Sequence, residues 1–204
     1  MVQLKKKELE IALQKVEPFA TPNPSDEQYP TPARIAADML FLAYSQGDIA
    51  GLKVADLGCG TGMLAIGAAL LGAESVLGLD KDQAALDIAM ENAERAGVRI
   101  ELTLGDVSEF KEKVDTVVMN PPFGSQRRHA DRPFLSKAME VAEVVYSLHN
   151  ASTQDFLIEM VSVAGSKAEV LKRYKLEIPH TFAFHKKANK DVEVLLLRIQ
   201  THGE

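Results

Sequence analysis

The chain contains a single cysteine, Cys59, among its 204 residues. One thiol excludes an internal disulfide and any zinc site built from several cysteines. No apolar run approaches the ~20 residues that a membrane-spanning helix needs. Residues 1–7 lead into a charged helix pattern and do not resemble an apolar signal segment. From these absences, residence in the cytoplasm is the default expectation.

Positive charge is also scarce, because 23 Lys and Arg face 29 Asp and Glu, a net charge of −6. Residues 54–116 carry most of the imbalance, with 5 basic against 12 acidic side chains. Elsewhere the cations gather in three clusters: Arg127 and Arg128 with Arg132, Lys172 and Arg173 with Lys175, and Lys186 and Lys187 with Lys190. Such clusters can hold a phosphate backbone. A solvated charged surface is the alternative for any one of them.

A clamp for a flat group that bears an NH2 follows the apolar run 114–119, which predicts a buried strand. The side-chain oxygen of Asn120 and the carbonyl of Pro121 can each accept a hydrogen bond from such an amine. Pro121 and Pro122 stiffen the turn, and Phe123 offers a ring for stacking. The four residues therefore predict a site that grips an amine beside an electrophile.

A glycine-rich turn lies upstream, where an apolar strand over 53–57 meets Gly58, Gly60 and Gly62 before a helix from Met63 to about 71. Glycine allows positive φ and lets the backbone approach a ligand closely. The G-x-G-x-G spacing lacks both the dinucleotide pattern and the Lys-Ser/Thr ending of a P-loop.

Two carboxylates end the next apolar runs, Asp80 after 75–79 and Asp106 after 99–104. A carboxylate at the end of the second strand can accept hydrogen bonds from both hydroxyls of an unphosphorylated ribose. Together with the glycine turn, these residues predict a nucleoside ligand. A nucleotide-phosphate turn in an ordinary Rossmann fold is the alternative.

These motifs resemble class I S-adenosylmethionine-dependent methyltransferases of the branch that methylates amino groups, over residues 20–200. A narrower similarity, in residues 27–32, 120–124, 145–149 and 184–187, is to the methyltransferase-like protein 5 family. Eukaryotic members of that family make N6-methyladenosine in small-subunit ribosomal RNA. The resemblance implies S-adenosylmethionine as cofactor and a flipped adenosine of structured RNA as substrate. No metal is expected, because methyl transfer to an amine does not require one.

The resemblance assigns catalysis to Asn120, Pro121, Pro122 and Phe123. It implies a cofactor pocket lined by Gln28, Thr31, Asp56, Gly58, Cys59, Gly60, Met63, Asp80, Lys81, Asp106, Val107 and Asn120. It leads us to expect RNA contacts from Arg127, Arg128, His185, Lys186 and Lys187. Cys59 is expected to give a backbone contact and no nucleophile. For residues 27–31, a simple turn before a capped helix is the alternative.

The chain order predicts an α/β fold, a seven-stranded and mostly parallel sheet with helices on both faces and an antiparallel last strand. Residues 1–31, a helix over 3–16 and a Pro-rich connector, should pack on a catalytic domain of residues 32–204. Thr31 is predicted to cap the next helix, with Pro32 at its first position. Later elements are expected as a helix over 133–140, a strand over 141–148, a helix over 153–163, and strands over 167–178 and 192–200.

A partner chain is a further expectation. Apolar residues alternate along the third strand, at Ile100, Leu102 and Leu104, and an exposed sheet edge invites strand addition. The resemblance implies a small zinc-binding activator, similar to the transfer-RNA methyltransferase subunit 112, at this edge. The alternative is that these side chains face the helix layer of the same domain.

Three functions compete on this evidence. The leading one is methylation of an adenosine amine in RNA, with small-subunit ribosomal RNA as the favoured target. A protein glutamine methyltransferase is the alternative, because a side-chain amide also presents NH2 and that branch has a similar Asn-Pro-Pro-aromatic clamp, usually with Tyr. A non-catalytic cofactor-binding scaffold is disfavoured by the intact clamp and glycine turn.

Overall fold

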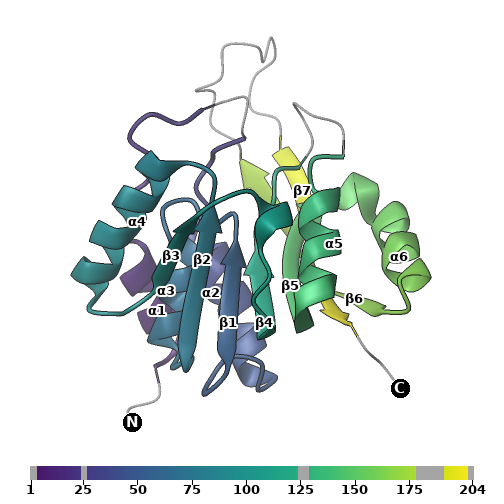
Figure 1. Cartoon of the computed structure of the whole chain (residues 1–204), viewed down its shortest axis with the longest axis horizontal. Helices are drawn as coiled ribbons and strands as arrows, with labels where there is room; N and C mark the ends of the chain where they lie inside the picture. The colour runs from purple at the N-terminus through teal and green to yellow at the C-terminus, as the bar shows by residue number, and fades with distance from the viewer. Residues whose placement is uncertain (1–3, 24–26, 124–128, 178–190, 202–204) are drawn as a thin grey trace.

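The computed structural model describes residues 4–23, 27–123, 129–177 and 191–201. They form a seven-stranded sheet in the order β3-β2-β1-β4-β5-β7-β6 (Figure 1). Neighbours from β3 to β5 pair in parallel, whereas β7 is antiparallel to both β5 and β6. The strands are β1 Lys53–Leu57, β2 Ser75–Asp80, β3 Glu101–Leu104, β4 Val114–Met119, β5 Ala142–Asn150, β6 Lys167–Glu177 and β7 Asp191–Gln200. The expected α/β fold, with a seven-stranded and mostly parallel sheet and an antiparallel last strand, is confirmed.

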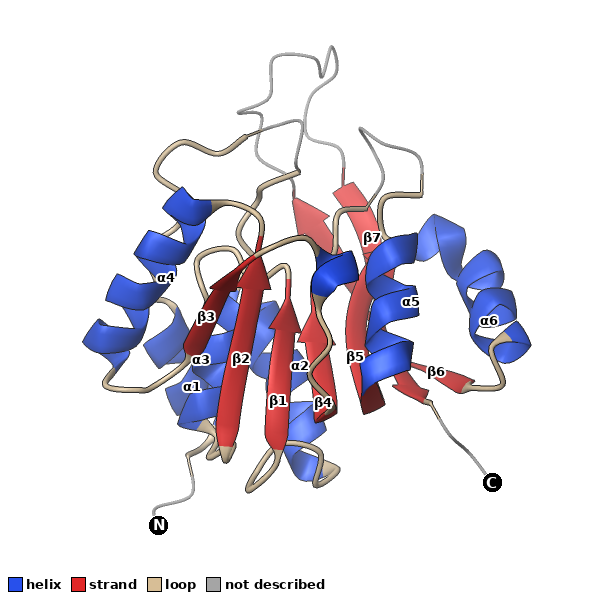
Figure 2. Cartoon of the chain, viewed as in Figure 1, coloured by secondary structure: helices blue, strands red, loops and turns tan. Residues whose placement is uncertain are grey.

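Helices cover both faces of this sheet (Figure 2). One buried cluster joins the sheet to three helices: α1 Lys6–Leu13, α2 Ala33–Ser45 and α3 Met63–Leu70. A second cluster lies on the other face, beneath α5 Arg132–Val141 and α6 Gln154–Val163. Helix α4, Gln83–Ala96, packs on α3, β2 and β3. Single 3-10 turns occupy Val107–Glu109 and Ala151–Thr153.

The apolar runs become strands because the central strands are buried on both faces. In β4, Val118 belongs to the cluster under α1–α3, while its neighbours Val117 and Met119 belong to the cluster under α5 and α6. Side chains of a strand alternate between faces, so an uninterrupted apolar run serves both layers. The loops after the parallel strands β1, β2 and β4 consequently meet at one edge of the sheet, where ligands of such folds bind.

The structure corrects two local predictions. Helix α1 spans Lys6–Leu13 and is shorter than the predicted 3–16. Thr31 does not cap α2, because Pro32 holds the N-cap position and no side chain caps the helix. The hydroxyl of Thr31 instead accepts a hydrogen bond of 2.9 Å from the side-chain nitrogen of Asn120. The hydroxyl that would have capped the helix therefore takes part in a tertiary hydrogen bond with Asn120.

Strand β3 lies at one edge of the sheet, as expected. Ile100 and Leu102 are partly buried, but Leu104 is 53% exposed. The apolar pattern of the strand is therefore divided between the helix layer and solvent. Among the described residues, no helix has the length and apolar character needed to cross a membrane.

Candidate functional site

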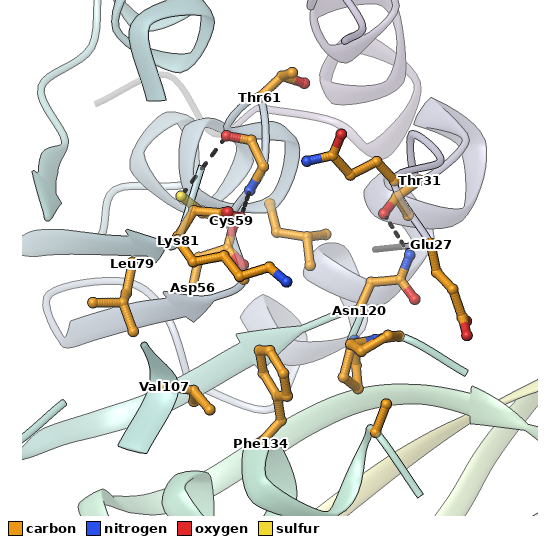
Figure 3. A pocket seen from close by; sticks show the side chains of 18 of the residues that line it. Glu27, Thr31, Asp56, Cys59, Thr61, Leu79, Lys81, Val107, Asn120 and Phe134 are labelled. Atoms are coloured by element: carbon orange, nitrogen blue, oxygen red, sulfur yellow. Dashed lines mark hydrogen bonds between the residues drawn. The ribbon is translucent and has the colours of Figure 1, made fainter. Parts of the chain in front are cut away.

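A cavity of about 460 Å³ opens at the carboxyl ends of β1, β2 and β4. All twelve residues expected to line a cofactor pocket line it: Gln28, Thr31, Asp56, Gly58, Cys59, Gly60, Met63, Asp80, Lys81, Asp106, Val107 and Asn120. Figure 3 shows the side chains of several of them, among them Thr31, Asp56 and Asn120. Pro121 and Pro122 line the same cavity. The cofactor turn at residues 58–60 and the amine clamp thus line the same cavity, although 60 positions separate Gly60 from Asn120.

The glycine turn is fastened to β2 by its backbone. The amides of Gly58 and Cys59 both donate to the carbonyl of Leu79, at 2.8 and 3.0 Å. Gly58, Gly60 and Gly62 have φ of 76°, 51° and 88°, values that favour glycine. A Cβ on Gly60 would lie 2.7 Å from the ring of Phe19. The turn therefore requires glycine for its conformation and for the close packing of an aromatic ring.

Asp56 is a buried carboxylate that is only half satisfied. One oxygen accepts from the amide of Ala65 at 2.9 Å, and the other, Oδ1, has no hydrogen-bond partner among the described residues. Burial, reinforced by the negative charge of Asp80, raises the pKa of Asp56 to about 8. A bound cation would supply what this carboxylate lacks.

Asp80 faces the cavity from the end of β2 and organises the turn opposite. Its carboxylate accepts from the amide of Gly60 at 2.8 Å and from that of Asp82 at 3.0 Å. Burial raises its pKa, although these two hydrogen bonds oppose the shift. Gln28 donates to the side chain of Asp82 at 2.7 Å and so joins the connector to the same group of residues.

Two remaining cofactor candidates differ in character. Asp106 is exposed, and hydrogen bonds from the hydroxyl and amide of Ser108, at 2.6 and 2.9 Å, lower its pKa. Cys59 is buried, and that burial, together with Asp56 and Asp80, raises the pKa of its thiol well above the usual value. A thiol held protonated is a poor nucleophile, which agrees with the prediction that Cys59 has no covalent role.

Asn120 presents one edge of its side-chain amide to the cavity. Its nitrogen donates to Thr31, whereas Oδ1 is enclosed and has no hydrogen-bond partner among the described residues. Figure 3 shows the Asn120–Thr31 bond beside Glu27. Phe123 does not line the cavity. Its ring packs on that of Tyr29, with 5.4 Å between the centroids and a tilt of 47°.

The predicted RNA-contact residues Arg127, Arg128, His185, Lys186 and Lys187 lie outside the described residues. Their described neighbour Arg132 stacks on Phe156, with the guanidinium carbon 4.0 Å from the ring centroid.

Two members of the cluster of Lys172, Arg173 and Lys175 make contacts within the chain. Lys172 pairs with Asp38, and Arg173 contacts Gln154 and Glu193. These two cations already have partners, so the solvated or structural alternative describes them better than a phosphate contact does.

Sequence reasoning missed several residues of the cavity wall. Phe19 comes from the Pro-rich connector, and Pro133 and Phe134 come from the start of α5. A Cβ on Gly58 would lie 3.0 Å from the ring of Phe134. No local motif marks these positions, because they reach the glycine turn only through the fold.

A buried chain of hydrogen-bonded side chains holds the start of α5 in place. Ser147 lies 2.8 Å from Nε2 of His149, whose Nδ1 lies 3.2 Å from the carboxylate of Asp131. All three residues are buried and none lines the cavity. The arrangement has the order of a hydrolase triad but lacks access to a substrate, so it ties α5 to β5.

Comparison with known proteins agrees with this geometry. The model of the ribosomal protein L11 methyltransferase (PrmA) family matches residues 37–121, the part that carries the glycine turn, Asp80 and the beginning of the clamp. The crystal structure of PH1948, a proposed RNA methyltransferase from Pyrococcus horikoshii, superposes with a TM-score of 0.90. The two chains are 46% identical, and the alignment covers 96% of this chain and 97% of the other.

Full-length similarity extends to curated relatives. The rRNA N(6)-adenosine-methyltransferase METTL5 of Danio rerio is 41% identical, over 96% of this chain and 98% of its own length. Its Drosophila melanogaster counterpart is 38% identical over the whole of both chains. By fold, cavity and full-length similarity, the chain belongs to the METTL5 family of methyltransferases.

Proposed function

We propose that this protein transfers a methyl group from S-adenosylmethionine to the N6 amine of an adenosine in RNA, with small-subunit ribosomal RNA as its target. The observation that carries the proposal is the enclosed oxygen of Asn120, which has no hydrogen-bond partner among the described residues. Thr31 engages the nitrogen of the same amide, so the edge left for a ligand is an acceptor. An exocyclic amine is the matching donor.

The residues of the cavity suit S-adenosylmethionine. Asp80 would accept hydrogen bonds from the ribose hydroxyls, and Asp106 with Val107 would border the adenine ring. The half-satisfied carboxylate of Asp56 would face the ammonium group of the cofactor's amino-acid end, near the glycine turn. When bound, this cofactor supplies an electrophilic methyl group on a sulfonium. The rings of Phe19 and Phe134 pack closely on Gly60 and Gly58, so they leave no room for side chains at these two positions of the turn.

The work of the clamp is positioning. The lone pair of an adenine amine is delocalised into the ring and is a weak nucleophile. Hydrogen bonds from that amine to Asn120 Oδ1 and to the carbonyl of Pro121 favour a tetrahedral nitrogen and direct its lone pair. Phe123, whose ring packs on the cavity-lining Tyr29, would stack on the part of a flipped base that lies outside the cavity. Orientation in a desolvated pocket supplies several kcal/mol of barrier reduction, and the product proton leaves without a strong base.

A transfer assay tests the proposed substrate class. Methyl-labelled S-adenosylmethionine would be incubated with the protein and with total RNA, DNA and protein from the source cell in parallel. We expect label in RNA, mapped to one adenosine of the small-subunit ribosomal RNA. Label confined to glutamine side chains of a protein would reject the proposal and favour the alternative function.

A small zinc-binding activator at the β3 edge is the second part of the proposal. Support comes from Leu104, 53% exposed on the edge strand, and from Met90, 52% exposed on α4, which packs against β3. Co-expression with the small zinc protein of the source organism, followed by size-exclusion chromatography, is the test. We expect co-elution and a gain in activity. Full RNA-methylating activity of a soluble monomer would remove the requirement for a partner.

A further inference from the structure

The hydroxyl of Tyr29 is another enclosed polar group beside the clamp. Its oxygen is shielded from solvent and has no hydrogen-bond partner among the described residues. Buried tyrosines usually pair their hydroxyl, and an unpaired buried polar group costs free energy. Tyr29 also lines the cavity. An unsatisfied donor in the wall of a ligand cavity marks a place where a ligand can supply an acceptor.

Two contacts place Tyr29 next to the amine clamp. Its ring packs on Phe123 at 5.4 Å between centroids, and Thr31, two residues further along the connector, accepts the bond from Asn120 at 2.9 Å. One short segment therefore holds the Asn120 amide in orientation and carries Tyr29 in the wall of the same cavity. The backbone is turned sharply there, since Glu27 has φ of 53°.

The side-chain oxygen of Asn120 and the hydroxyl of Tyr29 have opposite hydrogen-bonding character. Asn120 offers an acceptor oxygen, and Tyr29 offers an O–H donor. Burial and the charge of Glu27 raise the pKa of Tyr29 well above its usual value, so the phenol keeps its proton. The pairing edge of adenine carries an amine donor beside the acceptor N1. Guanine and uracil carry a carbonyl beside a ring N–H, which is the reverse order.

We infer that Tyr29 is a specificity-determining residue, which donates its hydroxyl hydrogen to N1 of the target adenine while Asn120 accepts from N6. This inference rests on the proposed function and deepens it. Flipped bases are commonly read on this edge. The pair rejects guanine and uracil because each would leave two like groups facing one another. Cytosine repeats the order of adenine, so its rejection depends on the size of the stacked ring.

A chemical cycle tests the contact. Parent protein and Tyr29→Phe would be assayed on RNA oligonucleotides that carry adenosine, 1-deazaadenosine or 7-deazaadenosine at the target position. The variant keeps the ring that packs on Phe123 and removes only the hydroxyl. Tyr44→Phe is the matched control, because Tyr44 lies on α2 and packs on Phe41, away from the cavity. Affinity for S-adenosylmethionine would be measured in parallel by calorimetry.

We expect the parent to lose roughly tenfold in kcat/KM on 1-deazaadenosine, and Tyr29→Phe to lose a similar factor on adenosine. The variant should lose nothing further on 1-deazaadenosine, and 7-deazaadenosine and the Tyr44 control should behave as the parent on adenosine. Losses that multiply, or a parent indifferent to N1, would refute the contact while leaving adenosine methylation intact. A loss of cofactor affinity in the variant would also refute it. A parent that methylates no adenosine oligonucleotide would overturn both proposals.

Discussion

Single residues in the cavity differ in how completely they are satisfied. Asp80 accepts two backbone hydrogen bonds, whereas Asp56 Oδ1 and Asn120 Oδ1 are enclosed and have no hydrogen-bond partner among the described residues. Leaving a buried polar group unpaired costs roughly 1–3 kcal/mol. A ligand that brings positive charge to Asp56 and an N–H donor to Asn120 recovers this free energy. The unpaired oxygens of Asp56 and Asn120 therefore favour a ligand that carries both a positive charge and an N–H donor.

Asp80→Ala tests the ribose contact. The change removes the proposed acceptor for the hydroxyls and also the acceptor for the amide of Gly60. We expect binding of S-adenosylmethionine to weaken by roughly 1–3 kcal/mol, measured by calorimetric titration. Asp87→Ala, an exposed position on α4, is the control. Equal affinity of Asp80→Ala and the parent would show that Asp80 does not hold the ribose.

Asp56→Asn should stabilise the ligand-free protein relative to the parent, by an amount that grows as pH rises. The pKa of Asp56 is about 8 in the folded chain, against an ordinary value of 3.8. The folded state therefore binds this proton more tightly, and stability falls as pH rises from about 4 to 8. Asparagine resembles the protonated form and avoids that loss. The melting temperature of the variant, measured against that of the parent, should gain progressively over this interval.

A matched control is Asp87→Asn, because Asp87 is exposed on α4. Its melting temperature should follow that of the parent at each pH. If the difference between Asp56→Asn and the parent is the same at pH 4 and pH 8, the raised pKa of Asp56 is wrong.

Among the elements, the connector between α1 and α2 makes contacts with both the cofactor turn and the clamp, which its residue pattern alone did not predict. Gln28 reaches Asp82, Thr31 holds Asn120, and Phe19 packs on Gly60. The described part of this Pro-rich segment thus lines the cavity beside both the cofactor turn and the clamp. This arrangement couples the predicted cofactor residues to the predicted catalytic residues.

Some elements follow directly from the sequence. The runs 53–57 and 114–119 match β1 and β4 residue for residue, because strands buried on both faces need continuous apolar residues. Cavity-lining positions near the glycine turn and the clamp were also predictable, since the ends of parallel strands meet at one edge. The resemblance supplied Gln28 and Thr31, which the residue pattern alone left open.

Other features could not be predicted because they depend on tertiary contacts. Thr31 has the sequence of a helix cap but bonds to Asn120. Phe134 reaches Gly58 from α5, on a different strand–helix unit. The sequence pattern gave no boundaries for helix α4, Gln83–Ala96, although the side chain of Asp82 caps it by accepting a hydrogen bond from the amide of Ala84. Local sequence does not record which distant group will compete for a side chain.

Asp38 ties α1 to α2 and β6, and its removal should loosen that assembly. Burial alone would raise its pKa, but hydrogen bonds from Lys172, Lys6 and Tyr174 outweigh burial and lower the pKa to about 2. The folded pKa lies below the ordinary value of 3.8. The stabilisation is therefore present above about pH 4 and is lost as pH falls toward 2.

We expect Asp38→Asn to lower the free energy of unfolding by roughly 1–3 kcal/mol at neutral pH. Hydrogen exchange in α1 should accelerate, and the difference from the parent should shrink near pH 2. Chemical denaturation at several pH values measures the first effect, with the exposed Lys7→Ala on the same helix as control. A stability loss that is independent of pH would mean that the ionised carboxylate contributes nothing.

At the scale of the whole molecule, charge is distributed unevenly. Residues 54–116, which form β1 to the middle of β4, hold 12 acidic and 5 basic side chains. This acidic segment, which carries most of the predicted cofactor residues, is unsuited to binding a phosphate backbone. RNA must therefore approach over the remaining part of the chain, or over a partner that contributes cations.

Lys186→Ala with Lys187→Ala tests the proposed RNA path. We expect weaker RNA binding and a shallower dependence of log affinity on log salt, because each phosphate contact removed reduces that slope by about 1. Binding of S-adenosylmethionine should not change. Lys172→Ala is a useful comparison, since Lys172 is held by Asp38. RNA affinity and salt slope equal to those of the parent would remove this pair from the path.

The central claim is that Asn120 positions an adenosine amine for methylation. Its most direct test is nucleoside mass spectrometry of RNA treated with labelled S-adenosylmethionine and either the parent or Asn120→Ala. We predict labelled N6-methyladenosine from the parent and about a hundredfold less from the variant, with cofactor affinity within a few-fold of the parent. Label in any other nucleoside, or equal N6-methyladenosine from both proteins, would contradict the account.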